Sequence, residues 1–398
     1  MPASLARRRF GPVAYFDHNA TTRLAPSARE AWLRAADEAW QNPGSPHRAG
    51  ARVRVRLEAA RAQLAELLDT DAKRLVFTGG ATEAAAGILA HLARVLPADA
   101  VVALNPTEHP CVLTAAQEHL GPDRLRWLRV TPDGVVTPAA VEEALRGAAA
   151  ESRSVGAIVV MAANNETGVL QPWAEIAALC RAEGAAFVCD GAQWLGKLPA
   201  SRFGEVDWMF GAAHKFGGPK GVGFVQRPID AEHFVLRAGT QERGQRAGTE
   251  DYPGIAALVA ALVEAEQTKV FQETARLQWR ERFERDVTQQ LPGVTVIGRT
   301  AERLWNTVSL VLPHGENTRW VARLDQRGFE VSTGSACASG REGPSHVLAA
   351  MGVAPELARR VIRISAGWET GVDDWEGLRA ALIAVAPEVR PAADVVSA

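Results

Sequence analysis

Two ionisable side chains, Asp190 and Lys215, follow short apolar runs at positions where they could do chemistry. Asp190 closes "AAFVCD" with Gln193 three residues beyond it, and Lys215 follows His214 in "AAHKFGGPKG". A lysine drawn into a cleft would be desolvated, and the lower pKa that results would make its amine a nucleophile. The aspartate could face a cationic partner in the same cleft. Taken singly, the lysine could equally be solvated and the aspartate could cap a helix.

A candidate anion site lies in "FTGGATE", residues 77–83, where two glycines precede Ala81 and Thr82 at an expected helix start. Free backbone N–H groups and the helix dipole favour an anion there, and Thr82 adds a hydroxyl donor. An ordinary helix cap with a permissive turn would give the same pattern. The segment lacks the GK[ST] ending of a nucleotide P-loop.

Two further motifs place polar side chains after apolar runs. His109 lies in "TEHP", and Asn164, Asn165 and Glu166 lie in "AANNETG". A lone histidine is usually structural, but polar side chains at the end of a buried strand are costly unless they are hydrogen-bonded or used. Together the motifs supply an anion cradle, a flat imidazole, a carboxylate, an amide and an amine. Pyridoxal 5'-phosphate requires all of these: the amine forms a Schiff base, the carboxylate pairs with the pyridinium nitrogen and the cradle holds the phosphate.

A single cysteine, Cys337, stands in "STGSACASG", residues 332–340, among small and hydroxyl-bearing residues. An exposed thiol needs a lowered pKa or a nearby base to react well at neutral pH, and the sequence does not show which. The plainer interpretation is an incidental surface cysteine. We expect the other cysteines to be inert packing residues on helices or a strand. These are Cys111, Cys180 and Cys189.

Composition excludes several classes of protein. No two of the four cysteines have CxxC spacing, so we expect no metal site and no disulfide framework, and the reducing cytoplasm is the simplest compartment. A net charge of -2 favours neither a nucleic acid nor a membrane surface as partner. No run approaches the ~18 apolar residues of a membrane span. The start, "MPASLARRRF", lacks the apolar stretch of a signal peptide, and its arginines only faintly resemble a transit peptide.

Short apolar runs alternate with amphipathic stretches from about residue 50 to residue 230. This alternation predicts an α/β domain with a mostly parallel central sheet flanked by helices. Ligands of such sheets bind beyond the carboxyl ends of the strands, where the motifs above lie. The expected strands are 74–78, 100–105, 125–130, 155–162, 185–190, 206–212 and 221–226.

The pattern changes after Pro253. A helical stretch continues to about Leu291 without Gly or Pro after Gly254, and shorter strands and helices follow. We expect a large cofactor-binding α/β domain over residues 20–262. Residues 1–19 and 263–398 would form a small α+β domain that carries the cysteine loop.

The motifs, in their order and spacing, resemble those of the cysteine desulfurases of the class V aminotransferase family, which are fold-type I pyridoxal-phosphate-dependent transferases. The resemblance extends from "YFDHNATT" at residues 15–22 to "RISAG" at residues 363–367. Between these lie "NPGSPHRAG", "FTGGATE", "TEH", "NNETG", "DGAQWLGKLP", "HKFGGPKGVG", "ERGQRAGTEDYPGI" and "STGSACAS".

The resemblance implies roles for individual residues. Lys215 would hold the cofactor covalently, Asp190 would pair with its ring nitrogen, and Gln193 would hydrogen-bond its ring hydroxyl. His109 would stack on the ring and relay protons. The other implied residues are Asn165 beside the cofactor and the substrate carboxylate, Ala81, Thr82 and His214 at the phosphate, Thr249 at the phosphate of the other subunit of a homodimer, and Arg363 at the substrate carboxylate.

The resemblance also gives Cys337 a function. Its thiolate would take the sulfur of L-cysteine as a persulfide, release L-alanine and pass the sulfur to an acceptor. The form of the loop resembles the long-loop NifS/IscS-like subgroup, whose acceptors are iron–sulfur scaffold proteins or thiolation relays. Gly334 and Gly340 would ease the motion that such transfer needs.

The chain departs from the family pattern at two places. Ala212 stands where a serine usually contacts the phosphate, a loss of about 1–2 kcal/mol if nothing replaces it. Ala84, Ala85 and Ala86 replace residues that are often polar. Two alternatives stay open at this point: a selenocysteine lyase or another class V aminotransferase or lyase, and a non-catalytic sulfur-transfer partner of the same fold.

Overall fold

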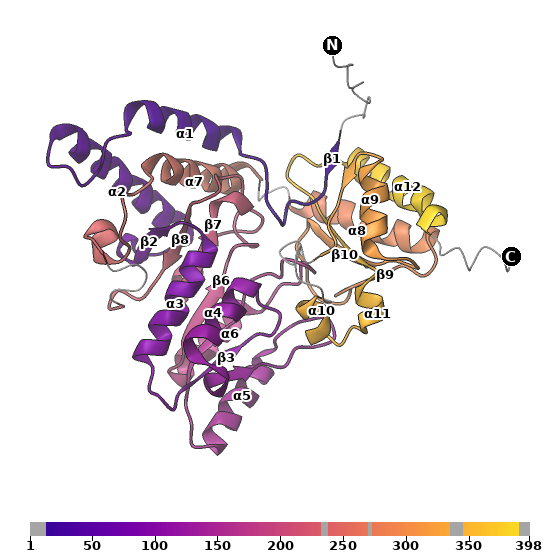
Figure 1. The fold of residues 1–398 in the computed structure, drawn as a ribbon, viewed down its shortest axis with the longest axis horizontal. Coiled ribbons are helices and arrows are strands. Elements are labelled where there is room, and N and C mark those ends of the chain that lie inside the picture. Colours follow the sequence, from indigo (N-terminus) through magenta and orange to yellow (C-terminus); the bar gives the residue numbers. More distant parts are fainter. Residues whose placement is uncertain (1–12, 232–237, 270–272, 335–344, 390–398) are drawn as a thin grey trace, which may run out of the picture.

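The computed structural model describes residues 13–231, 238–269, 273–334 and 345–389. It has two bodies that lie side by side (Figure 1). The larger body is built around one sheet and includes the middle of the chain. The smaller one contains the C-terminal elements together with the first strand. The domain bounds expected from the sequence stay a prediction.

Seven strands in the described ranges form the sheet of the larger body, in the order β2-β8-β7-β6-β5-β3-β4 (Figure 1). Neighbouring strands are parallel except at β8, which is antiparallel to both β2 and β7. The predicted mostly parallel α/β sheet is therefore confirmed. The strands are β2 (Leu75–Thr78), β3 (Val101–Leu104), β4 (Leu125–Trp127), β5 (Val155–Val159), β6 (Ala186–Asp190), β7 (Trp208–Ala212) and β8 (Gly223–Gln226).

Helices cover both faces of this sheet, which is why its strands read as nearly continuous apolar runs. In β2, Val76 packs with the helices of one face, and Leu75 and Phe77 pack with those of the other. The first face carries α3 (Ala81–Val95) and α4 (Pro110–Leu120). The second carries α1 (Pro26–Glu38), α2 (Arg48–Leu68), α5 (Pro138–Ala150), α6 (Trp173–Glu183) and α7 (Tyr252–Glu264).

The smaller body has its own apolar core. Strands β9 (Thr295–Val296), β10 (Thr307–Val311) and β12 (Val361–Ser365) pair antiparallel, and β1 (Ala14–Tyr15) pairs in parallel with β11 (Phe329–Glu330). Its helices are α8 (Glu273–Gln290), α9 (Asn317–Asp325), α10 (His346–Ala350), α11 (Pro355–Ala358) and α12 (Val372–Val389). No helix in the described ranges has both the length and the apolar character to cross a membrane.

The described part of the stretch expected to be helical up to about Leu291 is helical. A π-helical turn, Ala265–Lys269, follows α7, and α8 extends over Glu273–Gln290. The hydroxyl of Thr268 donates a 2.5 Å hydrogen bond to the carbonyl of Glu264. Such side-chain donation to a helix carbonyl competes with the regular backbone ladder. The sequence pattern did not predict the change from α-helix to π-helix at this turn.

The crossing segment, residues 14–25, connects the two bodies. It leaves β1 on the smaller body and enters α1 on the larger one. Backbone N–H groups along it bind first one body and then the other, so its path is fixed on both sides. These bonds extend from Phe16 to Glu330 and from His18 to Ser365 on the smaller body, and from Thr22 to His214 and from Ala25 to Gly217 on the larger one.

A buried ion pair holds the loop that precedes Thr249. Both carboxylate oxygens of Glu242 accept from Arg61, at 2.7 and 2.9 Å, and one of them also accepts the Phe77 N–H at 2.9 Å. The Arg61 guanidinium lies 4.8 Å from the centre of the Phe77 ring. Glu242 and Arg61 are both almost fully buried, so each charge depends on the other.

We expect Arg61→Met to lower the free energy of unfolding by about 3–5 kcal/mol, because it leaves the Glu242 carboxylate buried without its cation. Urea unfolding measures this free energy. Arg202→Met is the matched control, since the Arg202–Glu205 pair is exposed and its loss should change little. Equal effects of the two substitutions would contradict the interpretation.

Candidate active site

A cavity of about 580 Å³ lies beyond the carboxyl ends of β5, β6 and β7, at the N-terminus of α3. This is the edge where α/β sheets bind their ligands. Most of the residues predicted from the motifs line it together, although they come from five separate stretches of the chain. These are Ala81, Thr82, His109, Asn165, Asp190, Gln193, His214 and Lys215.

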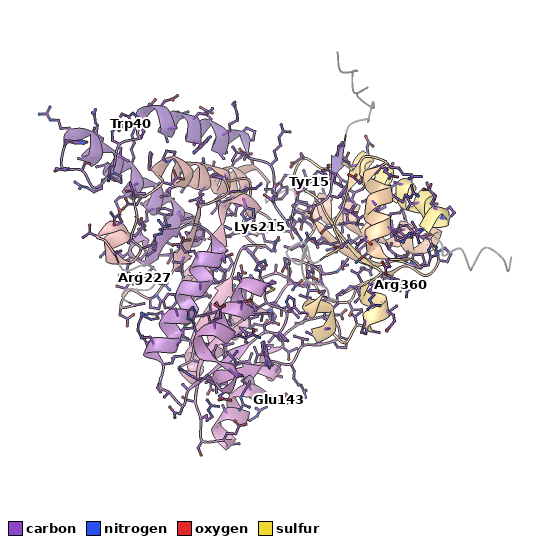
Figure 2. The ribbon with its side chains drawn as sticks, viewed as in Figure 1. Tyr15, Trp40, Glu143, Lys215, Arg227 and Arg360 are labelled. Carbon is purple, nitrogen blue, oxygen red and sulfur yellow. The ribbon has the colours of Figure 1, made fainter. Side chains whose placement is uncertain are left out.

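Lys215 enters the cavity from the 3-10 turn Ala213–Lys215, directly after β7. Its amine donates to two backbone carbonyls of the crossing segment, Asn19 O at 2.7 Å and Ala20 O at 2.9 Å. Figure 2 shows Lys215 near the junction of the two bodies. The lysine was predicted from the sequence, but the carbonyls that hold it were not. Backbone acceptors carry no residue signature, and "FDHNATT" gave no role for Asn19 or Ala20.

Asp190 is the last residue of β6 and is 6% exposed. One carboxylate oxygen accepts the backbone N–H of Ala192 at 2.8 Å. Burial raises the pKa of Asp190 to about 6, while the Ala192 bond and the charge of Lys215 act in the opposite direction. The carboxylate would therefore gain from a cationic partner in the cavity.

His109 caps α4, because its ring accepts the backbone N–H of Cys111 at Nδ1, 3.2 Å away. Burial, together with the charges of Lys215 and His346, lowers the pKa of His109 to about 4. The ring is therefore neutral near pH 7. Since Nδ1 accepts, its proton lies on Nε2.

The cysteines divide into two kinds. Cys180 and Cys189 are fully buried, and burial raises the pKa of both thiols, of Cys180 to about 12, so the prediction of inert packing holds for them. Cys111 differs, because it lines the cavity and its Sγ lies 3.0 Å from Nδ1 of His109. The sequence pattern placed Cys111 correctly on a helix. It could not show that the first turn of this helix faces the cavity.

A further buried acid, Glu108, was missed. It is fully buried, and one carboxyl oxygen accepts from Met161 N–H at 2.5 Å and from Asn105 at 3.2 Å. Burial and the nearby Asp190 raise the pKa of Glu108 well above its usual value, so it holds a proton. The only signal in the sequence was its position before His109 in "TEHP".

The N-terminus of α3 provides the anion cradle. Gly80 precedes it with a φ of +146° and has open space where a Cβ would stand, so a ligand can approach the backbone closely. Glu83 accepts the Gly79 N–H at 2.7 Å and pairs with Arg246, which directs its charge away from the following N–H groups. His214 contacts the Thr21 hydroxyl at 3.2 Å on the opposite wall.

The donor set fits pyridoxal 5'-phosphate. The cavity combines an amine, a buried carboxylate and a helix N-terminus, which match an aldehyde, a pyridinium nitrogen and a phosphate. Oδ1 of Asn165 is buried and has no hydrogen-bond partner in the part of the chain that the structure describes, so an acceptor is left for a bound group to satisfy.

Two predicted residues lie outside this cavity. Arg363 is 2% exposed and donates to Asp17 at 2.5 Å, to Asn165 O at 3.1 Å and to Gly334 O at 3.0 Å. Thr249 is exposed and borders a separate small cavity with Gly79 and Gly221. A third predicted residue, Cys337, lies outside the described residues.

The departures from the family pattern have physical explanations in part. Ala84 and Ala85 are buried against the sheet, where a polar side chain would need a partner. Alanine at these two positions therefore suits the packing of the helix on the sheet. Ala212 is buried and lines the cavity, so the missing hydroxyl is a real loss of a donor at the site.

Residues 14–378 match the model of the aminotransferase class-V family. The chain belongs to this family. It is 37% identical over 358 residues to a cysteine desulfurase of Klebsiella pneumoniae, a match that covers 88% of this chain and 87% of the relative. Among solved structures, a NifS-like protein superposes with a TM-score of 0.85 at 26% identity, over 94% of this chain and all of the other. SspA, solved in complex with cysteine, matches with a TM-score of 0.75 at 27% identity, over 89% of this chain and 98% of the other. The fold expected from the sequence is thereby confirmed.

His109 leads to a prediction about acid stability. Its folded pKa of about 4 lies below the ordinary histidine value of 6.5, so the unfolded chain binds the proton first as the pH falls. Stability from this group is complete above pH 6.5 and is lost as the pH falls towards 4. His109→Asn keeps a capping acceptor but removes the titrating ring. We expect its unfolding free energy to rise less steeply with pH over this window than that of wild type, by the equivalent of up to one bound proton.

Urea unfolding of the cofactor-free protein at several pH values tests this. Asp190 contributes a slope of opposite sign, because its pKa is raised, but it is present in both proteins and cancels in the comparison. His119→Asn is the control, since His119 is exposed in the last turn of α4. Identical slopes for wild type and His109→Asn would show that the imidazole titrates as an exposed group.

Proposed function

We propose that the protein is a cysteine desulfurase, which removes sulfur from L-cysteine with pyridoxal 5'-phosphate and leaves L-alanine. The observation that carries the proposal is the convergence of the Lys215 amine and the buried Asp190 carboxylate in one cavity at the α3 N-terminus. The match to cysteine desulfurases over most of the chain supports it.

The cofactor would be held at three points. Lys215 supplies the amine that binds its aldehyde, Asp190 the negative charge beside its ring nitrogen, and the N-terminus of α3 the N–H groups for its phosphate. When bound, the cofactor supplies an electron sink for the carbon centre of the substrate. The further contacts proposed for it are Ala81, Thr82, His109, Asn165, Gln193 and His214.

The ionisation of Asp190 depends on this group. A carboxyl whose pKa is about 6 still carries a proton in a fraction of the molecules near neutrality. A cation within hydrogen-bond reach would stabilise the anion and complete its ionisation. The cavity is therefore preorganised for a protonated ring nitrogen rather than a neutral one.

Two residues would hold and move protons. His109 offers an Nε2–H donor in its neutral state, and its capped Nδ1 keeps that proton in place. The carbonyls of Asn19 and Ala20 orient the Lys215 amine by accepting hydrogen bonds from it. They would hold the amine in place while it exchanges protons with a substrate. The neutral imidazole suits donation from Nε2, and proton removal falls to the amine.

Arg363 would bind the substrate carboxylate. Its Nε is buried and has no hydrogen-bond partner among the described residues, while its terminal nitrogens bind Asp17, Asn165 O and Gly334 O. A guanidinium with an unused donor gains a charge-assisted bond when a carboxylate arrives. Because Gly334 borders the segment with Cys337, the same side chain links substrate binding to the start of that segment.

Cys337 would receive the sulfur. Its thiolate attacks the sulfur of bound cysteine, an S–S bond forms, and the C–S bond breaks with its electron pair staying on carbon. That carbon then takes a proton and leaves as L-alanine, and Cys337 keeps a persulfide. The persulfide passes its outer sulfur to an acceptor thiol, in iron–sulfur cluster assembly or thiolation.

We also propose a cytoplasmic homodimer. Thr249 is exposed and does not line the cavity of its own chain, which suits contact with the phosphate site of a second subunit. The Arg61–Glu242 pair would hold its loop for that contact.

Lys215→Ala should abolish turnover and the covalent capture of the cofactor. Borohydride treatment of wild type with pyridoxal phosphate, followed by peptide mass spectrometry, should place the adduct on Lys215. Lys220→Ala, which removes an exposed lysine from the rim of the same cavity, should keep both properties. Undiminished alanine formation by Lys215→Ala would refute the assignment.

Cys337→Ala should keep the visible band of bound cofactor but lose persulfide and lower alanine formation by several orders of magnitude, because the nucleophile is gone. Cys180→Ala is the control, since its thiol is buried away from the cavity. Normal sulfide release by Cys337→Ala would exclude the loop thiol as acceptor. Release of selenide from selenocysteine by that variant, with no activity on cysteine, would favour the lyase alternative.

A further inference from the structure

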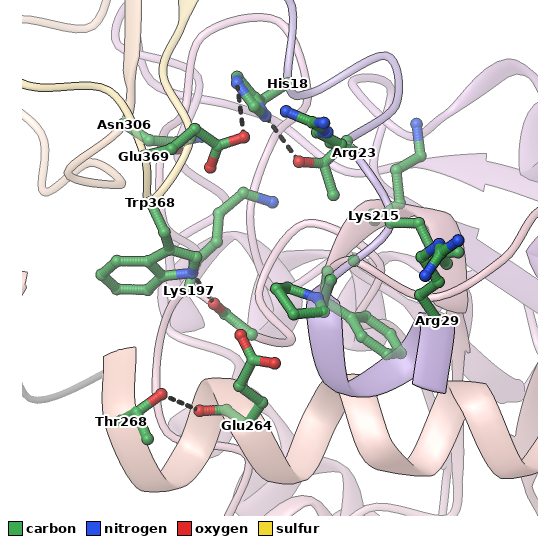
Figure 3. Close-up of a pocket in the computed structure, with 18 of the residues that line it drawn as sticks. His18, Arg23, Arg29, Lys197, Lys215, Glu264, Thr268, Asn306, Trp368 and Glu369 are labelled. Atoms are coloured by element: carbon green, nitrogen blue, oxygen red, sulfur yellow. Dashed lines mark hydrogen bonds and ion pairs between the residues drawn. The ribbon is translucent and has the colours of Figure 1, made fainter. Parts of the chain in front are cut away.

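Lys197 is a buried lysine to which the proposed reaction gives no role. It lies after β6, is 5% exposed and lines a second cavity, of about 1390 Å³, between the two bodies (Figure 3). Burial, with the charges of Lys215 and Arg363, lowers its pKa to about 7. In the described part of the chain no carboxylate forms an ion pair with it. A buried amine without a counter-ion is costly, so its retention calls for a physical reason.

Both hydrogen bonds of the Lys197 amine go to one residue. Nζ donates to the backbone carbonyl of Gln193 at 3.1 Å and to its side-chain Oε1 at 3.0 Å. The backbone of Lys197 is itself fixed, because its carbonyl accepts the indole N–H of Trp305 at 3.1 Å. A neutral amine has two N–H donors, which these two acceptors satisfy, whereas the ammonium form carries a third.

This contact decides which way the Gln193 amide faces. In its ammonium form Lys197 donates and cannot accept, and this form holds the oxygen of the amide towards Lys197 and the nitrogen away from it. The nitrogen donates one hydrogen to Asn19 O at 2.9 Å, the carbonyl that also holds the Lys215 amine. Gln193 lines the 580 Å³ cavity, and its second N–H is left for a group bound there.

We propose that Lys197 is a positioning residue that acts through Gln193 and orients its amide N–H towards the ring oxygen of the cofactor. This inference rests on the proposed function. Without Lys197, Oε1 would be a buried acceptor without a donor, and rotation of the amide could present the oxygen to the ring instead. The hydrogen bonds from Lys197 to Gln193 and from Gln193 to Asn19 thus place an N–H donor and the reactive amine of Lys215 around the carbonyl of Asn19.

Simple space-filling is the competing role. A lysine stem contributes apolar contacts, and a methionine of similar length would supply them equally well. A direct effect of the lysine charge on the cofactor is the other competitor. A spectroscopic readout separates these roles, since packing changes stability without changing the protonation of a bound chromophore.

The test is a double-mutant cycle on the enzyme loaded with pyridoxal phosphate. The readout is the pH midpoint of its visible absorption band. Lys197→Met should raise the midpoint by about one pH unit, because an N–H donor to the ring oxygen favours loss of the neighbouring proton. Lys197→Arg keeps N–H donors at this position, so it should return the midpoint most of the way to the wild-type value. Lys220→Met is the matched control for loss of a lysine at the cofactor cavity.

The cycle with Gln193→Leu gives the decisive comparison. If Lys197 acts through Gln193, Lys197→Met adds no further shift in the Gln193→Leu background. An additive shift means that the lysine charge acts directly, and no shift in either background means that the lysine only fills space. Both outcomes overturn the proposal. Lys197→Leu enters the same cycle if Lys197→Met does not fold, as judged by its thermal midpoint.

Failure of the inference and failure of the proposed function are distinguishable. A wild-type protein that gains no visible band with pyridoxal phosphate would reject the function itself. A normal band and titration in wild type, unchanged by Lys197→Met, would reject the inference alone.

Discussion

The site depends on the amine of Lys215 being held by two backbone carbonyls. Asn19 and Ala20 belong to the crossing segment, which is hydrogen-bonded to β11 and β12 on one side and to the turn around Lys215 on the other. The lysine comes from one body, while its acceptors lie in a turn of the crossing segment that is anchored to the other. The position of the reactive nitrogen is therefore fixed only when the two bodies are in place together.

The same segment places other parts of the site. The side chain of Asn19 donates to Asn165 O at 3.1 Å and to Thr307 at 2.9 Å, and its N–H donates to Ser365 at 3.0 Å. Asp17 binds Arg363. Local changes in this segment would reach the amine, the proposed carboxylate-binding arginine and the amide of Gln193 at once, because all of them are hydrogen-bonded to it.

Burial prepares the cavity for a charged guest. The pKa of Asp190 is raised, that of His109 is lowered, and Lys197 has no counter-ion among the described residues. Each departure reflects a low-dielectric environment in which a group carrying complementary charge would be strongly stabilised. These departures cost stability in the free protein and would favour binding of a dipolar cofactor.

The sequence by itself determined the class of fold and the residue types of the site. Strand-ending motifs such as "FVCDGAQ" and "AAHKFGG" placed Asp190 and Lys215 at one sheet edge, because parallel strands present their carboxyl ends together. Only the tertiary structure decided that Asn19 and Ala20 hold the amine and that Cys111 touches His109. It also showed that Lys197 donates to Gln193 and that a π-helical turn follows α7. Backbone acceptors, side-chain orientation and burial depend on which distant segments meet, and residue type at one position does not encode that meeting.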